Sequence, residues 1–104
     1  MRIEWSDQAL DDLSDILLYV VDSFVEAVAY RVNNEIIDEV GILAQSPMMG
    51  RQLFFNKTKS ITYRTLSLRH YKIVYYTKDD ILKIIMLWNN RRDNKALIRQ
   101  LSSF

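Results

Sequence analysis

The chain between positions 61 and 88 is dense in β-branched and aromatic residues, and polar residues interrupt it twice, at Arg69 and His70 and again at positions 78–80. This pattern predicts three antiparallel strands joined by two tight turns. Successive side chains of a strand point to opposite faces, so the middle strand carries apolar side chains on both: Tyr71, Ile73 and Tyr75 on one, Val74 and Tyr76 on the other. Such a sheet needs a covering layer, which only residues 6–46 are long enough to supply.

Residues 6–46 show the three- and four-residue spacing of two amphipathic helices. A short strand, Arg2 to Trp5, leads into Ser6, whose side chain is of the type that caps helix N-termini. The first helix is predicted to bury Leu10, Leu13, Leu17, Val20, Val21 and Phe24. A Ser-x-x-Glu capping box at Ser23–Glu26 predicts a break near residue 22 and a second helix from Phe24, which would bury Val25, Val28, Ala29, Val32, Ile36, Val40 and Leu43. Two helices with so short a connection form an antiparallel hairpin.

The remaining elements are short. Pro47 ends the helical hairpin, and the next residues, Arg51 to Phe55, have the pattern of an edge strand. After the three strands, Asp93 or Asn94 can cap a last helix, which faces inward with Leu97 and Leu101. The order predicts a single α+β domain over residues 1–104, with an N-terminal strand, an antiparallel two-helix hairpin packed on a mainly antiparallel four-stranded sheet, and a short C-terminal helix.

Composition narrows the class of protein. The chain has no cysteine, which excludes a disulfide scaffold, a thiolate metal site and a cysteine nucleophile, and which fits the reducing interior of a cell. No apolar run approaches the ~20 residues that cross a bilayer, and the N-terminus lacks the apolar core of a signal peptide. We therefore expect a cytoplasmic protein with no membrane partner.

The formal net charge of +1 conceals two halves of opposite sign. Residues 1–49 carry ten acids and two bases, a net charge of −8, whereas residues 50–104 carry twelve bases and three acids, a net charge of +9. A compact domain built from such halves is expected to present a basic surface that attracts phosphates or an acidic protein segment. The alternative is that the two halves attract each other.

Motifs that mark common catalytic and cofactor sites are missing. There is no Gly-x-x-x-x-Gly-Lys phosphate loop, no Gly-x-Gly-x-x-Gly and no His-Glu-x-x-His. A single histidine, His70, argues against a histidine-based metal site, and Asp79 and Asp80 fit a hairpin turn better than a ligand pair. We expect neither a metal nor a cofactor. His70 itself fits a turn, with proton transfer as the alternative role.

Positive side chains follow the three predicted strands. Arg64, Lys72 and Lys83 lie on the strands, and the connections at their ends carry Arg69, Arg91 and Arg92. Cations that converge on a concave sheet face can bind a phosphodiester and stabilise a pentacoordinate transition state without a metal. The alternative is a solvated face with scattered cations. Four tyrosines on the same strands fit core and cross-strand pairs better than a platform for stacking bases: Tyr63, Tyr71, Tyr75 and Tyr76.

Several short patterns follow one another along nearly the whole chain. They are Ala9-x-x-Asp12-Leu13-x-x-Ile16-x-x-Tyr19, Leu43-x-x-Ser46-Pro47-x-x-Gly50-Arg51, Tyr63-Arg64-x-Leu66, Tyr71-Lys72-Ile73-Val74-Tyr75 and Ile84-x-x-Leu87-Trp88-Asn89-Asn90-Arg91-Arg92-Asp93. In this order and spacing they resemble the RelE/ParE superfamily of bacterial toxins. The resemblance implies a toxin of a type II toxin–antitoxin module, held inactive by an antitoxin whose C-terminal segment wraps around it. It leaves open a homo-oligomer or a hetero-oligomer with the antitoxin. An acidic, partly disordered antitoxin tail would suit the basic half.

The resemblance implies two candidate targets, the translating ribosome with its mRNA, and DNA gyrase. The ribonuclease branch would hold the scissile phosphate with Arg64, Lys72 and Arg91. Leu66 and Leu97 stand where that branch has a lysine and a tyrosine, so His70 or Tyr63 would have to act as general base. The long helical hairpin resembles the ParE-like branch, which acts by binding to gyrase. A third possibility is a non-toxic member that only binds its antitoxin.

Overall fold

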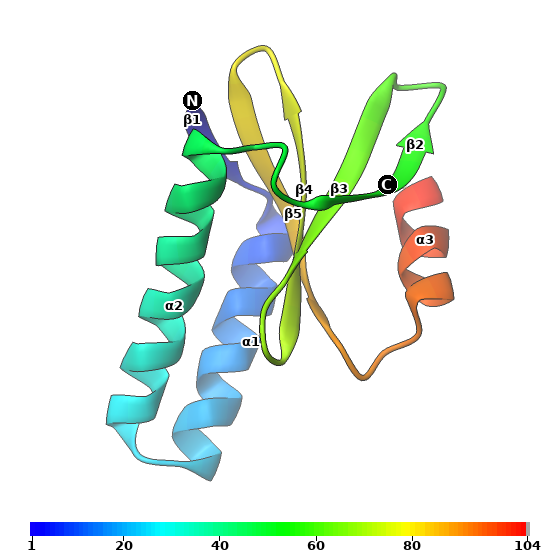
Figure 1. Ribbon diagram of the computed structural model, residues 1–104. Coiled ribbons are helices and arrows are strands. Elements are labelled where there is room, and N and C mark those ends of the chain that lie inside the picture. Colours follow the sequence, from blue (N-terminus) through cyan, green and yellow to red (C-terminus); the bar gives the residue numbers. More distant parts are fainter. Residues whose placement is uncertain (104) are drawn as a thin grey trace.

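The computed structural model describes residues 1–103, which form five strands and three helices (Figure 1). In chain order these are β1 Arg2–Trp5, α1 Asp7–Ser23, α2 Glu26–Gln45, β2 Arg51–Asn56, β3 Ile61–Ser67, β4 Tyr71–Lys78, β5 Ile81–Asn89 and α3 Asn94–Ser102. The sheet order is β1-β5-β4-β3-β2, with β1 parallel to β5 and every other pair antiparallel. The predicted α+β fold is confirmed, and the N-terminal strand extends the four predicted sheet strands to five.

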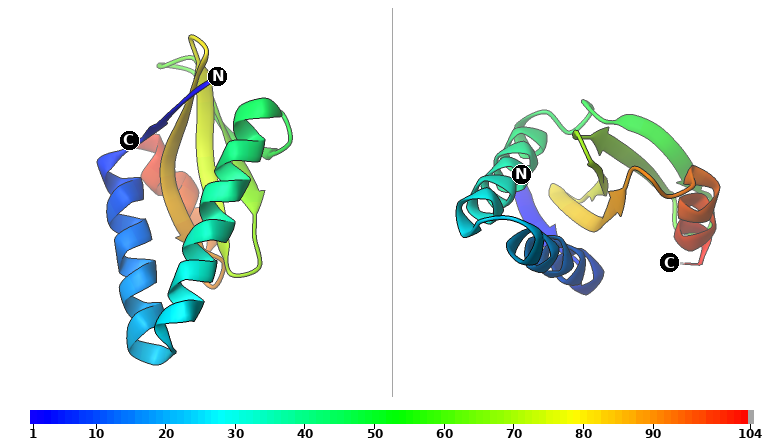
Figure 2. Two further views of the ribbon diagram at one scale, coloured as in Figure 1. Left: turned by 90° about the vertical axis from the view of Figure 1, so that its left-hand side faces the viewer. Right: turned by 90° about the horizontal axis from the view of Figure 1, so that it is seen from below.

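Helices cover the sheet on both faces (Figure 2). The α1–α2 hairpin packs on one face, where Ile73 and Tyr75 of β4 join its core, and α3 packs on the other, where Val74 joins a second core. This alternation is the one that the sequence predicts. The β4–β5 register shifts between Val74 and Tyr75, and the resulting bulge turns both Ile85 and Met86 toward α3.

The helical hairpin differs in detail from its prediction. Helix α1 begins after Ser6, whose hydroxyl oxygen accepts the N–H of Ala9 at 2.9 Å, as expected of an N-cap. It continues through Ser23, because the Phe24 N–H still donates to a carbonyl of the last turn, that of Val20, at 2.8 Å. Ser23 is thus part of α1 and cannot cap α2, whose N-cap position is held by Val25 without a side-chain hydrogen bond. The predicted capping box is therefore wrong.

Some apolar residues of the hairpin are not buried. Phe24 and Val25 are 60% and 68% exposed, and Leu10 and Val21 are about half exposed. The prediction that these four residues face the core is wrong. Figure 1 shows the reason for the first two, because the closed end of the hairpin projects beyond the sheet. Leu10 and Val21 each follow a buried residue, Ala9 and Val20, and so point about 100° around the helix from it.

A carboxylate ties α1 to β5. Strand β1 has only four residues, so the edge of β5 is free beyond it. There the Ser6 hydroxyl donates to the Ile85 carbonyl at 2.5 Å, and Oδ2 of Asp12 accepts the Leu87 N–H at 3.0 Å. The Gln8 amide donates to Oδ1 of Asp12 at 2.7 Å. Burial raises the pKa of Asp12 above its usual 3.8, although both of its hydrogen bonds act to lower it.

The junction between α2 and β2 is held by a second set of hydrogen bonds. The Tyr75 hydroxyl donates to the Pro47 carbonyl at 2.7 Å and accepts the Gly50 N–H at 2.9 Å, while Nη1 of Arg64 donates to the Gly50 carbonyl at 2.8 Å. A Cβ at position 50 would collide with the Tyr75 ring and would lie 2.9 Å from the Thr65 carbonyl oxygen. Glycine is therefore needed here for the close approach of two strands and a loop.

Substitutions at Asp12 should separate its charge from its hydrogen bond. Asp12→Asn keeps an oxygen that accepts the Leu87 N–H and removes a desolvated charge. Because the folded-state pKa is raised, the stability that Asp12 contributes is fully present below 3.8 and is lost as pH rises through the folded-state value. Asp12→Asn should therefore match the wild type at the acid end and become more stable than it above this window. Asp12→Ala should cost about 1–3 kcal/mol throughout, because the N–H is left unpaired.

Urea denaturation of the three proteins across this pH window measures these differences. A gap between Asp12→Asn and the wild type that does not change with pH would contradict the role assigned to the carboxylate.

The α2–β2 junction gives a second prediction. Tyr75→Phe removes both hydrogen bonds of the hydroxyl and leaves the Gly50 N–H unpaired, so the free energy of unfolding should fall by about 1–3 kcal/mol. Tyr30→Phe is the matched control, because Tyr30 is 64% exposed, and it should change stability by less than about 0.5 kcal/mol. Denaturant titration monitored by circular dichroism compares them, and equal effects would show that the junction hydrogen bonds contribute nothing.

Candidate anion-binding surface

The predicted cations divide between the two faces of the sheet. Arg64 lies opposite Tyr75 in the β3–β4 register, and both face the helical hairpin. Lys72 is three residues from Tyr75 along β4 and so points to the other face, where its Nζ donates to Oδ1 of Asn94 at 2.8 Å. The expectation that Arg64 and Lys72 converge on one sheet face is therefore wrong, because an odd separation along a strand places side chains on opposite sides.

Arg64 has a structural role at the junction between α2 and β2. Its guanidinium group binds the Gly50 carbonyl and lies close to the Tyr75 hydroxyl. Burial raises the pKa of Tyr75, and the hydrogen bond from Gly50 and the positive charge of Arg64 partly offset this effect. The arginine thus stabilises the loop that joins α2 to β2, and its charge is directed toward the interior of that junction.

Other predicted residues meet at one end of the sheet, where the β3–β4 turn lies beside the β5–α3 connection. The Asn90 N–H donates to the His70 carbonyl at 3.0 Å and joins the two segments. The His70 ring packs edge-on against Tyr71, with 6.4 Å between ring centres. Burial raises the pKa of Tyr71, and the charge of Arg91 lowers it by a smaller amount. His70 and Arg91 therefore lie near the start of β4, where Lys72 is found.

Cations continue from this end along α3. The guanidinium carbon of Arg92 lies 3.8 Å from the centre of the Trp88 ring, and the indole N–H of Trp88 donates to the Arg92 carbonyl at 3.4 Å. The next two cations, Lys95 and Arg99, are exposed on α3. Neither residue is among the cations that the sequence pattern assigns to the site, although both stand outside the apolar stripe of the helix, which is the signal that identifies them.

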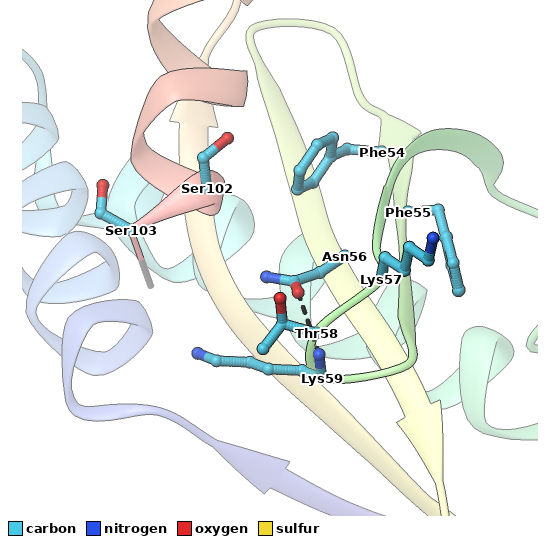
Figure 3. A pocket seen from close by; sticks show the side chains of 8 residues that line it. All are labelled: Phe54, Phe55, Asn56, Lys57, Thr58, Lys59, Ser102 and Ser103. Atoms are coloured by element: carbon cyan, nitrogen blue, oxygen red, sulfur yellow. Dashed lines mark hydrogen bonds between the residues drawn. The ribbon is translucent and has the colours of Figure 1, made fainter.

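A shallow hollow of about 560 Å³ lies at the far end of α3 (Figure 3). Its lining comes from the β2–β3 connection and from the end of α3, and comprises Phe54, Phe55, Asn56, Lys57, Thr58, Lys59, Ser102 and Ser103. Oδ1 of Asn56 accepts the Lys59 N–H at 3.0 Å and shapes this loop. We define the basic strip as the cations that follow α3 from one end to the other, namely Lys57, Lys59, Lys72, Arg92, Lys95 and Arg99.

The cations of the basic strip form no ion pair with a carboxylate of residues 1–103. Within residues 1–103 the one ion pair joins Arg2 and Glu4, at 3.7 Å. No carboxylate in this part of the chain therefore neutralises the basic strip at ion-pair distance, and the two oppositely charged halves are not joined by ion pairs. Asp93 is adjacent in sequence, but its carboxylate caps α3 by accepting the Lys95 N–H at 2.9 Å. An anionic ligand would find an accessible row of positive charge.

The part of the chain that the structure describes has no cluster of side chains suited to bind a metal ion. Residues 1–103 contain no group of three or more histidine, aspartate and glutamate side chains that could hold a metal ion. In the same residues, no helix combines the length and the apolar character needed to cross a membrane.

Comparison with known proteins identifies the family. The protein-family model described as the ParE toxin of the type II toxin–antitoxin system parDE matches residues 3–94. A solved structure described as the chromosomal ParDE TA system from P. aeruginosa contains a chain that is 20% identical to this one. The match has a TM-score of 0.71 and covers 86% of this chain and 95% of that chain. This similarity shows that the two chains share a fold. A search of curated proteins found no match. Because the family model covers most of the sequence, this chain belongs to the ParE toxin family of type II toxin–antitoxin systems.

Proposed function

We propose that this toxin arrests growth in the cytoplasm by binding DNA gyrase, and that it acts without catalysing a reaction of its own. Membership of the ParE toxin family supports the toxin role and an antitoxin partner. The observation that carries the proposal is the basic strip, a row of cations that no carboxylate of residues 1–103 neutralises. Such a row attracts an acidic surface and speeds its association.

The positions that an RNA-cleaving site would need also favour binding over cleavage. A phosphodiester cleavage site gathers cations and a general base around one phosphate. Arg64 and Lys72 instead face opposite sides of the sheet. Leu66 and Leu97 stand where the ribonuclease branch has a lysine and a tyrosine. Leu66 packs against the hairpin core, and Leu97, on the inner side of α3, is completely buried.

The same surface offers a way for the antitoxin to hold the toxin inactive. An acidic antitoxin segment that lies along the basic strip would occupy the surface that gyrase needs. Competition for one charged surface requires no conformational change in the toxin, and the affinity of both partners should fall as salt concentration rises.

Ribosome-dependent mRNA cleavage is the second candidate, because His70, Lys72 and Arg91 lie at the same end of the sheet. In that reaction Lys72 and Arg91 would hold the phosphate and His70 would accept the proton of the attacking 2′-hydroxyl. Arg64 would have no direct part in it, since its guanidinium group is bound to Gly50.

The gyrase proposal predicts a charge-dependent inhibition of DNA supercoiling. The double variant Lys95→Gln, Arg99→Gln should raise the half-inhibitory concentration about ten-fold, a loss of about 1.4 kcal/mol of binding free energy. Both side chains are exposed, so the fold should be unaffected. The control Arg31→Gln, Lys78→Gln removes the same charge away from the basic strip and should shift inhibition by less than about two-fold.

Unaltered supercoiling by purified gyrase, at toxin concentrations that arrest growth, would rule out the gyrase proposal. Primer extension on ribosome-bound transcripts then tests the second candidate. Cuts that disappear with His70→Ala and with Arg91→Ala would support cleavage, whereas an absence of growth arrest on induction would indicate a non-toxic member.

A further inference from the structure

The hollow at the C-terminal end of α3 has two walls of different chemistry (Figure 3). One wall is the β2–β3 connection, residues 56–59, and the other is the end of α3, which contributes Ser102 and Ser103. Phe54, from β2, completes the lining with an aromatic ring. The volume of about 560 Å³ lies within the range of small-molecule sites, about 300–1,000 Å³.

The loop wall offers positive charge and hydrogen-bond donors. Because Oδ1 of Asn56 accepts the Lys59 N–H at 3.0 Å, the amide nitrogen of Asn56 is left for a ligand. Figure 3 shows this nitrogen and the Thr58 hydroxyl on the side of the loop that faces the end of α3. Lys57 and Lys59 form no ion pair within residues 1–103, and no acidic residue lines the hollow. This wall therefore suits an anionic group such as a phosphate.

The helix wall offers acceptors instead. The Ser102 hydroxyl donates to the Ile98 carbonyl at 2.9 Å. The Ser103 hydroxyl donates to the Arg99 carbonyl at 3.1 Å. Each hydroxyl has a single hydrogen, so these bonds leave only oxygen lone pairs for a ligand. The C-terminal end of a helix also carries a partial negative charge, so this wall suits the N–H donors of a ligand and disfavours its phosphate.

Phe54 brings a flat apolar surface that the core holds in place. The Tyr63 ring stacks on it, with 6.2 Å between ring centres and an angle of 10° between the planes. Tyr63 is itself almost completely buried, and Tyr76 packs edge-on against it at 5.8 Å. The side of Phe54 that lines the hollow therefore belongs to a fixed ring, on which a planar group such as a nucleobase can stack.

We propose that this hollow binds a nucleotide whose base carries an exocyclic amino group. Such a ligand has an anionic phosphate at one end, an aromatic ring system, and N–H donors on the base edge, as in adenine and cytosine. The phosphate lies against Thr58 and Lys59, the base stacks on Phe54, and the amino group donates to the oxygens of Ser102 and Ser103. The nucleotide is either a free molecule or one unit of a single strand.

This site is separate from the proposed action on gyrase. Lys57 and Lys59 belong to both the hollow and the basic strip, but binding of a nucleotide to the toxin alone requires no gyrase. Either proposal can therefore fail while the other stands.

Matched pairs of nucleotides test the chemistry of the two walls. AMP and IMP differ in whether the base carries an amino group or an oxygen at one position, and so do CMP and UMP. NMR titration of the ¹⁵N-labelled full-length toxin should give dissociation constants for AMP and CMP that are at least about five-fold lower than those for IMP and UMP. The signals of residues 56–59, 102 and 103 should shift. Equal affinities for AMP and IMP, or unchanged signals at these residues, would overturn the proposal.

A charge variant locates the phosphate. Lys59→Gln should weaken AMP at least about five-fold, because it removes a cation from the loop wall. Arg69→Gln is the matched control, since it removes the same charge from an exposed residue in the β3–β4 turn, at the other end of β3, and it should change the affinity by less than about two-fold. Equal effects of the two variants would show unspecific charge attraction and would overturn the proposal.

A second variant locates the amino group. Ser102→Ala with Ser103→Ala removes both acceptor oxygens from exposed positions, so the fold should be retained. The preference for AMP over IMP should fall below about two-fold while the affinity for IMP changes little, a result that a purely structural role of the serines would not produce. An unchanged preference would contradict the assigned orientation of the base and overturn the proposal.

A single-stranded adenine oligonucleotide of about eight units distinguishes the two sources of the nucleotide. Affinity at least about ten-fold above that of AMP, reduced by Lys59→Gln, would support a nucleic-acid strand as the ligand. Affinity no higher than that of AMP would support a free nucleotide.

Discussion

Strands β4 and β5 bury large side chains on both faces, and this requirement determines the rest of the architecture. Ile84 and Tyr75 face the helical hairpin, whereas Met86 and Trp88 face α3, and all four are almost completely buried. A single layer of helices cannot exclude water from two faces of a sheet. The chain therefore places a two-helix layer on one side and adds the short helix α3, held by two buried leucines, on the other.

The two covering layers carry opposite charge, and the apolar sheet keeps them apart. The hairpin is acidic and the α3 side is basic, as the two halves of the sequence require. Two layer spacings of ~10 Å each separate the charges on the outer surfaces of the two layers, a distance of about 20 Å. This distance exceeds the Debye length of about 8 Å at physiological ionic strength. The two layers therefore present surfaces of opposite charge that do not neutralise each other.

Arg64 illustrates how a residue in a family pattern can serve the fold. It resembles a phosphate-binding residue by position, yet in the structure it closes the junction at Gly50 together with the Tyr75 hydroxyl. Asp12 has a similar role in the first helix, where its half-buried carboxylate accepts a hydrogen bond from the edge of β5. Both polar side chains stabilise connections between elements, so their occurrence in the patterns of a toxin family does not require a catalytic role.

The sequence by itself determined the type and order of the elements, the alternating faces of β4 and the separation of charge, because each depends on neighbours along the chain. Only the tertiary structure decided that Arg64 and Lys72 lie apart, because this depends on which residues of β3 and β4 pair. It also decided that Phe24 and Val25 are exposed, because the helical period marks an apolar stripe but not the point at which the sheet beneath it ends. Near Ser23 the chain could form one more hydrogen bond of α1 or let the Ser23 side chain cap α2. These two alternatives are too similar in free energy for a local sequence pattern to distinguish them.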